Sequence, residues 1–371
     1  MKRLIFKKKK IFLCVFILFL GEKTAFAQKI SALHVAVAGL SHDHAYGLFE
    51  QYKQGKVDII GIAENDTALI SRYSKRYALS PRLFYPDLKT LLQKVKPEAV
   101  LAYNPISEHK AVVDLCAPLK IHVMVEKPLA TTAADARSIA ATAEKYGISV
   151  LTNYETSWYA SNREVGKFFM QDTTFGPVRK MVAHDGHEGP KEIGVSKQFL
   201  SWLTDPVKNG GGAIIDFGCY GANLMTWMMK GEKPKSVSAV MHRIKPDVYP
   251  KVDDDATIVL EYTNATGIIE GSWNWPFSIK DFEVFGKTGY AQAVNNNTIR
   301  TRMHNEQKYT ISNIENTEYQ FRDNLIYFEN VIHKKIKEDE NDVSSLKNNV
   351  IVVEILDAAK RSAQSGRKEV L

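Results

Sequence analysis

Over its first half, the chain alternates short apolar runs with longer stretches that mix apolar and charged residues. The apolar runs occupy residues 33–38, 57–63, 99–103, 122–125 and 149–151. Stretches such as 132–146, rich in alanine and charged residues, are typical of helices between them. Apolar strands that alternate with helices form βαβ units, in which both faces of a parallel sheet are covered. This pattern predicts a doubly wound α/β domain.

The pattern changes after Asn153. One helical stretch, 162–170, precedes strand-like runs at 178–184, 236–242, 257–262, 267–273 and 282–285. Strands that follow one another without intervening helices favour a largely antiparallel sheet, and the polar residues 263–266 can form a hairpin turn. Apolar residues at helical spacing near the chain end predict a final helix. We therefore expect a second domain of the α+β class with an open sheet.

The first 27 residues have the order of a cleavable signal peptide. Basic residues at positions 2, 3 and 7–10 precede an apolar run at 11–20, and small residues precede Gln28. The run is shorter than the roughly 20 residues that span a bilayer, so no stable membrane span is expected after cleavage near Ala27. We expect an exported, periplasmic protein with a signal peptide at 1–27 and domains at 28–151 and 152–371.

The charge of the chain lies largely in this leader. Residues 1–27 contain seven basic residues and one acid, so the net charge of +7 falls to +1 without them. A nucleic-acid-binding surface needs an excess of basic residues on the folded part, which makes nucleic acid an unexpected partner. Cys116 and Cys219, which fall in different predicted domains, are expected to be buried free thiols.

The turn after the first strand has part of a dinucleotide-binding motif. In Rossmann-type domains, a G-x-G-x-x-G turn places helix N–H groups against the pyrophosphate. Here Gly39 matches the first glycine, Leu40 follows it, and Ser41 and His44 replace the second and third glycines. Ser41 is small enough to donate its hydroxyl to a phosphate. An ordinary strand-to-helix turn without a ligand is the alternative interpretation.

Glu64 and the two histidines His42 and His44 refine the expected ligand. Glu64 follows the second strand, where an acid binds the ribose hydroxyls of NAD and repels the 2′-phosphate of NADP. We therefore expect NAD, with NADP disfavoured. His42 and His44 supply two imidazoles but the sequence gives no clear third ligand, so no metal site is expected.

Three segments carry a family resemblance. They are Glu126-Lys127-Pro128 after an apolar run, Asn104-Pro105 with His109, and the segment 210–220, which reads GGGAIIDFGCY. Together they resemble the glucose-fructose oxidoreductase, inositol dehydrogenase and rhizopine catabolism (Gfo/Idh/MocA) family. The sequences at 175–178 and 286–289 extend the resemblance over nearly all of the chain after the leader.

The resemblance implies an NAD-dependent oxidoreductase and assigns roles to its residues. Lys127, Asp216 and Tyr220 are the implied catalytic residues. Tyrosine has a pKa near about 10, so Tyr220 needs a nearby positive charge to act as a base. Asp216 and Tyr220, four residues apart, share one face if this segment is helical. The residues implied to bind the cofactor are Gly39, Leu40, Ser41, His42, Glu64, Asn104, Pro105, His109, Glu126 and Lys127.

Aromatic and polar residues of the second domain are candidates for binding a carbohydrate. Aromatic faces stack on sugar C–H groups, and polar groups bind hydroxyls. The candidates are Tyr154, Trp158, Arg163, His184, His187 and Trp202. The resemblance also implies a homo-oligomer formed through the second sheet.

Export conflicts with a diffusible cofactor, because free NAD is not expected outside the cytoplasm. The family offers two solutions: a tightly bound cofactor that oxidises one sugar and reduces another, and a glycoside hydrolase that uses NAD transiently through oxidation and elimination. Both use the same residues. A non-catalytic, exported sugar-binding or assembly subunit is the third interpretation, favoured by the altered glycine turn and opposed by Lys127, Asp216 and Tyr220.

Overall fold

A computed structural model describes residues 33–172 and 174–371. The expected signal peptide, 1–27, lies outside these residues. The first sheet has six parallel strands in the order β3-β2-β1-β4-β5-β6. Its strands are β1 (Leu33–Ala38), β2 (Val57–Ala63), β3 (Phe84–Tyr85), β4 (Ala99–Ala102), β5 (His122–Glu126) and β6 (Val150–Asn153). This strand order is that of a Rossmann domain, in which ligands bind where the order reverses, between β1 and β4.

Helices cover both faces of this sheet. On one face lie α1 (Ala45–Lys53), α2 (Thr67–Tyr77) and, from late in the chain, α10 (Asn324–Ile332). On the other lie α3 (Leu88–Lys94), α4 (His109–Cys116) and α5 (Ala133–Tyr146). The side chains of Asp66, Asp87 and Thr132 accept backbone N–H groups at the starts of α2, α3 and α5, which fixes where these helices begin.

The second sheet has nine strands in the order β14-β13-β12-β11-β7-β10-β9-β8-β15. Its strands are β7 (Val178–Gly186), β8 (Ser236–His242), β9 (Asp255–Glu261), β10 (Thr266–Ser272), β11 (Ile279–Gly286), β12 (Gly289–Ala293), β13 (Thr298–Met303), β14 (Thr310–Asn313) and β15 (Glu369–Val370). Neighbouring strands are antiparallel except β10 and β7, which are parallel. The polar residues between β9 and β10 form the expected hairpin turn.

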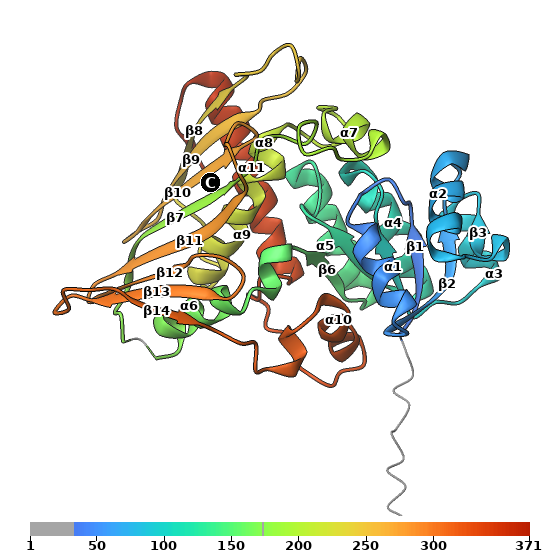
Figure 1. Cartoon of the computed structure of the whole chain (residues 1–371), viewed down its shortest axis with the longest axis horizontal. Helices are drawn as coiled ribbons and strands as arrows, with labels where there is room; N and C mark the ends of the chain where they lie inside the picture. The colour runs from blue at the N-terminus through green and yellow to red at the C-terminus, as the bar shows by residue number, and fades with distance from the viewer. Residues whose placement is uncertain (1–32, 173) are drawn as a thin grey trace, which may run out of the picture. The chain divides into compact units, whose positions relative to one another are not determined.

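One face of the second sheet is covered by helices (Figure 1). The remaining helices are α6 (Ala160–Met170), α7 (Lys197–Leu203), α8 (Ala213–Asp216), α9 (Gly218–Met228) and α11 (Leu346–Ser365). Every residue of α9 is buried. Short 3-10 helices span Pro81–Leu83, Ile106–Glu108, Ala117–Leu119, Glu155–Trp158 and Tyr319–Phe321.

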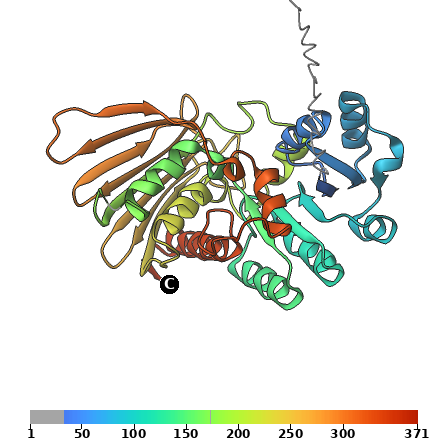
Figure 2. The ribbon, with the colours of Figure 1, turned by 90° about the horizontal axis from the view of Figure 1, so that it is seen from below.

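Helix α11 contributes to both domains. Ile351, Val352 and Leu356 pack in the core of the second domain, whereas Val353 packs in the core that contains α4 and α5. Figure 2 shows α11 beneath the second sheet, near α5. The two sheets are therefore joined through a helix near the end of the chain.

The predicted fold class is confirmed: a doubly wound parallel sheet is followed by a largely antiparallel sheet. The domain boundaries stay a prediction, and α10 departs from them, because Leu325, Tyr327 and Phe328 pack in the core of the first sheet. Cys116 and Cys219 are free and buried, as expected. No helix among the described residues combines the length and apolar character needed to cross a membrane.

Candidate active site

A buried ion pair joins the two domains. Lys127 follows β5, and its Nζ lies 2.5 Å from Oδ1 of Asp216 and 2.9 Å from the Asp216 carbonyl oxygen, at the end of α8. The Trp273 Nε1–H donates to the other carboxylate oxygen at 3.0 Å. Burial opposes both charges, but their mutual attraction outweighs it, so the pKa of Lys127 is raised and that of Asp216 is lowered. Lys127 is therefore an ammonium group at neutral pH, not a free amine.

The polypeptide around Asp216 is not one continuous helix. Helix α8 ends at Asp216, Phe217 breaks the pattern, and α9 begins at Gly218. Before α8, Gly212 lies so close to Asp253 that a Cβ atom there would stand 1.7 Å from the Asp253 carbonyl oxygen. The segment is helical with a break between Asp216 and Tyr220, and both side chains reach Lys127.

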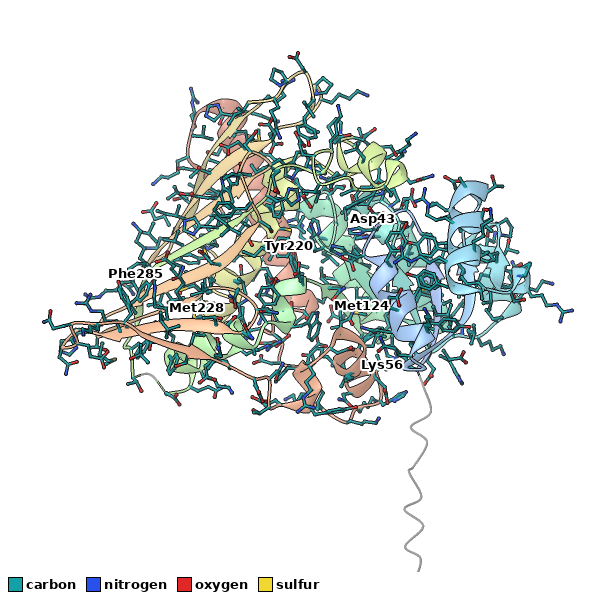
Figure 3. The ribbon with its side chains drawn as sticks, viewed as in Figure 1. Asp43, Lys56, Met124, Tyr220, Met228 and Phe285 are labelled. Atoms are coloured by element: carbon teal, nitrogen blue, oxygen red, sulfur yellow. The ribbon has the colours of Figure 1, made fainter. Side chains whose placement is uncertain are left out.

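Tyr220 presents the face of its ring to two cations. The Nζ atoms of Lys127 and Lys280 lie 4.9 and 4.8 Å from the ring centroid. Burial, followed by the nearby charge of Glu155, raises the pKa of Tyr220 well above 10. Tyr220 therefore holds its proton at neutral pH and can donate a hydrogen bond, while its role as a base stays a prediction. Figure 3 shows Tyr220 in the region between the two sheets.

Three charged residues next to Tyr220 were missed by the sequence analysis. Lys280 and Asp185 are paired across β11 and β7, and Lys280 forms an ion pair with Glu155. Glu155 also accepts the Tyr159 hydroxyl at 2.7 Å. Asp185 is buried, its Oδ2 has no hydrogen-bond partner among the described residues, and burial raises its pKa well above the usual range. Strand alternation is the signal that identifies Asp185, because buried Met181 and Ala183 lie on the same side of β7.

Three of the six carbohydrate candidates lie in the site or next to its residues. His187 belongs to the site: its ring packs edge-on against Phe217, and burial lowers its pKa against the opposing effect of the Asp216 carboxylate. Tyr154 packs edge-on against Tyr220 and is fully buried, so it supports the site from behind. Trp158 donates its Nε1–H to Asn153 at 3.0 Å and lines, with His44 and Glu155, a separate cavity of about 370 Å³.

The other three candidates require correction. His184 alternates with Asp185 along β7, so it lies on the opposite face of the sheet, where it bonds Asp281 at 2.7 Å. Arg163 forms an ion pair with Asp342, with 2.6 Å between Nη1 and Oδ2, and so connects two segments of the second domain. Trp202 lines the cofactor cavity described next, and its Nε1–H points at the carbonyl oxygen of Ser41 at 3.4 Å.

A cavity of about 570 Å³ opens at the carboxyl ends of β1, β2 and β4. Gly39 has φ of 78°, and a Cβ there would approach Asn104 Cβ to 2.8 Å, so glycine is required. The Ser41 hydroxyl and Asn104 Oδ1 are buried without a partner in the described part of the chain, and both residues line the cavity. Unpaired polar atoms at the strand-order reversal fit a dinucleotide whose phosphates and hydroxyls bond to them.

Glu64 lies at the end of β2 and lines the same cavity. Its carboxylate accepts the backbone N–H groups of Leu40, Asn65 and Asp66, each at 2.8 Å. These bonds fix the carboxylate at the position where an acid binds the adenosine ribose in dinucleotide folds. Pro105 also lines the cavity, close to Asn104.

The substitution of the third glycine by His44 is accommodated at the start of α1. His44 precedes the helix, and its Nδ1 bonds Glu126 Oε2 at 2.8 Å, so the ring points toward the Glu126-Lys127-Pro128 segment. Asn153 donates to the other oxygen of Glu126 at 2.8 Å. Glu126 is thus held by His44 and Asn153 immediately before Lys127.

His42, His44 and Glu126 bring three potential metal ligands within 4.8 Å of one another. Glu126 is the third ligand that the sequence did not reveal. However, the His42 Nδ1 accepts the N–H of His44 at 3.2 Å, and burial, followed by nearby charges, lowers its pKa, so a neutral His42 carries its proton on Nε2. A protonated nitrogen has no lone pair for a cation. The absence of a metal site here stays a prediction.

His109 opens α4, as expected, and is fully buried. Its Nδ1–H reaches the carbonyl oxygen of Leu129 at 3.2 Å, which ties α4 to the loop that follows Lys127. Burial outweighs this bond and lowers the pKa of His109 to about 4. His109 is therefore neutral at physiological pH and holds the loop by hydrogen bonding.

This shift predicts a pH dependence of stability. Between pH 6.5 and about 4, the unfolded chain binds a proton at His109 more readily than the folded protein. The contribution is fully present above pH 6.5 and is lost as the pH falls to about 4; its size is on the order of 3 kcal/mol. We expect the unfolding free energy of His109→Gln, measured by urea denaturation, to fall less over this range than that of the unsubstituted protein. Equal losses would contradict the prediction.

Two family models match the chain, one in each domain. Residues 33–154 match the model "Oxidoreductase family, NAD-binding Rossmann fold", and residues 167–292 match the "GFO/IDH/MocA C-terminal domain". Among curated relatives, trans-1,2-dihydrobenzene-1,2-diol dehydrogenase of Bos taurus is 24% identical over 261 residues, which cover 70% of this chain and 72% of the relative. The Homo sapiens enzyme of the same name is 23% identical over 264 residues, covering 70% and 73%.

Solved structures share the fold. An aldose-aldose oxidoreductase from Caulobacter crescentus, complexed with glycerol, has a TM-score of 0.77 and 22% identity, with 92% of this chain and 100% of the other covered. An inositol dehydrogenase homologue from Azotobacter vinelandii, complexed with NAD+, has a TM-score of 0.75 and 16% identity, covering 92% and 97%. With a matching model for each domain, the chain belongs to the Gfo/Idh/MocA family and is an oxidoreductase of that type.

Proposed function

We propose that the protein is an NAD-dependent oxidoreductase that acts on a sugar, glycoside or related polyol. The observation that carries the proposal is the buried Lys127–Asp216 pair beside Tyr220. It follows β5, at the same edge of the first sheet as the cavity beside Gly39 and Asn104. Relatives named as a dihydrodiol dehydrogenase and an aldose-aldose oxidoreductase support a substrate that bears hydroxyl groups.

Oxidation of an alcohol removes a hydride from carbon and a proton from oxygen; NAD, if held in the cavity beside Gly39 and Asn104, would supply the hydride acceptor. The ammonium group of Lys127 favours loss of the proton, because a hydroxyl that receives its hydrogen bond ionises more readily. Once Lys127 passes one of its own protons to Asp216 Oδ1, 2.5 Å away, its nitrogen has a free electron pair that takes up the substrate proton, so Lys127 ends as an ammonium group and Asp216 as a carboxylic acid. Tyr220 donates a hydrogen bond that helps to hold the substrate oxygen.

The charges around the cavity support NAD over NADP. Four carboxylates line it, those of Glu64, Asp66, Asp87 and Glu108, and Lys208 is the one lysine or arginine among its described lining residues. A 2′-phosphate adds two negative charges near the ribose, where Glu64 is fixed by three backbone N–H groups. Repulsion between these groups disfavours the phosphorylated cofactor.

We further propose that residues 1–27 direct export to the periplasm, and that the cofactor is tightly bound and recycled in place. One substrate is oxidised and a second is reduced at the same site, so no free NAD is consumed. The name of the Caulobacter relative, which pairs two aldoses, supports this chemistry.

Redox-assisted glycoside hydrolysis is the second candidate, and Asp185 favours it. Elimination of a leaving group after oxidation needs a proton donor, and Asp185 is a buried carboxyl group whose raised pKa keeps it protonated. Its neighbour across the sheet, Lys280, stands over Tyr220. A non-catalytic subunit is disfavoured, since such a protein has no need of a buried ion pair at this position.

We also propose a homo-oligomer formed through the face of the second sheet that lies opposite its described helices. Val240, Val259, Phe285 and Ile311 are exposed in four of its strands. Figure 3 shows Phe285 on the side of this sheet away from Tyr220. Association of copies would remove this apolar surface from water.

The proposed function is tested by denaturing the purified protein and measuring any nicotinamide cofactor that is released. The native protein is then incubated with pairs of aldoses and with aryl glycosides. An oxidised and a reduced sugar in equal amounts support the recycling oxidoreductase, whereas free aglycone without net NADH supports the hydrolase. A protein that releases no cofactor and also fails to bind added NAD would contradict both candidate functions.

A further inference from the structure

The segment 196–208, which contains α7, comes from the second half of the chain and yet lines the cavity of the first domain. Gln198, Ser201, Trp202 and Lys208 contribute to its wall, opposite Gly39 and Glu64. Figure 1 shows α7 next to the helices of the first sheet. We call this segment the clasp.

Both ends of the clasp are bonded to the first domain. At its start, the Ser196 N–H donates to Asp43 Oδ2 at 2.7 Å. At its end, the Ser107 N–H donates to the Lys208 carbonyl oxygen at 3.0 Å. Asp43 lies in the altered glycine turn and Ser107 in the loop after β4, so the clasp crosses the cavity where the strand order reverses.

A side-chain bond holds the clasp near its start. Arg72 of α2 donates to Gln198 Oε1 at 2.9 Å, and Gln198 in turn points its amide at Asp66 Oδ2, 3.4 Å away. Arg72 does not line the cavity, so it contributes to the enclosure only through Gln198.

Aromatic packing closes the clasp over the glycine turn. The His42 ring lies 4.4 Å from the Phe199 ring and 5.4 Å from the Trp202 ring, measured between centroids. His42, Phe199 and Trp202 are all buried, so water is excluded from this contact. The turn that would receive the pyrophosphate is therefore covered from the second domain.

We propose that the clasp retains the dinucleotide, and that the Arg72–Gln198 bond is its latch. This inference rests on the proposed function, because the cavity must hold NAD. The clasp contacts join protein to protein, so they must break before the segment moves away from the cavity. A cofactor that leaves slowly is what in-place recycling requires.

The test measures how fast bound NADH dissociates from the protein that comprises residues 28–371. Excess NAD is added to prevent rebinding, and the release is monitored by NADH fluorescence. Arg72→Met and Gln198→Ala each remove the latch from one side, and each is expected to speed dissociation about five- to tenfold. The double variant is expected to be no faster than the faster single variant, because both remove the same interaction. Arg76→Met is the matched control: Arg76 is on the same helix but contacts Glu50 and tyrosine rings instead of the clasp.

The outcomes separate the clasp from the proposed function. Binding of NADH with an unchanged dissociation rate in both latch variants would overturn the clasp and leave the proposed function standing. A protein that binds neither NADH nor NAD would overturn both. Faster dissociation in Arg76→Met to the same extent would also overturn the latch, because the effect would then belong to α2 in general.

Discussion

Replacing Lys127 with methionine is expected to reduce turnover by about 10²- to 10⁴-fold, the range for loss of a proton-transfer group. The variant loses the ammonium group that we propose binds the substrate oxygen, and Asp216 loses the group with which it exchanges a proton. Stability also falls, because the Asp216 carboxylate remains buried without its counter-ion; breaking a buried pair in this way costs about 3 to 5 kcal/mol. Turnover is measured on a substrate found by incubation with the aldoses and aryl glycosides, and unfolding is measured by urea denaturation.

A double variant separates the two effects. Lys127→Met with Asp216→Asn removes both charges, so most of the lost stability is expected to return while turnover stays low. Lys110→Met is a matched control, since Lys110 forms an equally short 2.5 Å pair with Asp114 on the exposed surface of α4. There the change is expected to cost less than about 1 kcal/mol and to leave turnover unchanged. Full turnover by Lys127→Met would refute the assigned role.

Replacing Gly212 with alanine is expected to be among the most destabilising single changes. The added Cβ would stand 1.7 Å from the Asp253 carbonyl oxygen, which is backbone and accepts the N–H of Ala213 at 3.1 Å. The chain must shift to relieve this overlap, and we expect a loss of about 3 kcal/mol or more in unfolding free energy. Because Gly212 immediately precedes α8, the shift also displaces Asp216 and lowers turnover.

Gly47→Ala in α1 is the control for this prediction. A Cβ at Gly47 meets nothing within 4 Å, and alanine favours helix, so a gain of about 0.5 to 1 kcal/mol is expected. Both variants are compared by urea denaturation and by turnover. Unfolding of Gly212→Ala at the same urea concentration as the unsubstituted protein would show that the close approach of Asp253 is not required.

The first sheet was predictable from sequence because its strands are continuous apolar runs; β1 and β2 have the expected bounds. The strands β12 to β14 were not predicted, since short runs such as 298–303 mix charged and apolar residues on a half-exposed sheet. The packing of helix α10 against the first sheet was not predicted, because apolar spacing predicts a buried face but does not identify the core that receives it.

Local motifs located the pair Lys127 and Asp216, but not the groups that surround it. Asp185 and Lys280 meet through strand pairing, and Glu126 meets His44 across 82 positions in sequence. Such contacts depend on tertiary register, which one sequence does not reveal. His184 was misplaced for a simpler reason: side chains alternate along a strand, so an error of one residue reverses the face.

Helix α11 has a consequence for the synthesis of the protein. Its Lys360 donates to the carbonyl oxygens of Thr131 and Gly210, at 3.2 and 3.3 Å, and so connects the loop after Lys127 to the loop before Asp216. The ribosome completes both loops long before it reaches this helix, whose 20 residues begin at Leu346. A chain that terminates before Leu346 would therefore contain Lys127, Asp216 and Tyr220, the three proposed catalytic residues, and still lack this link between the two loops.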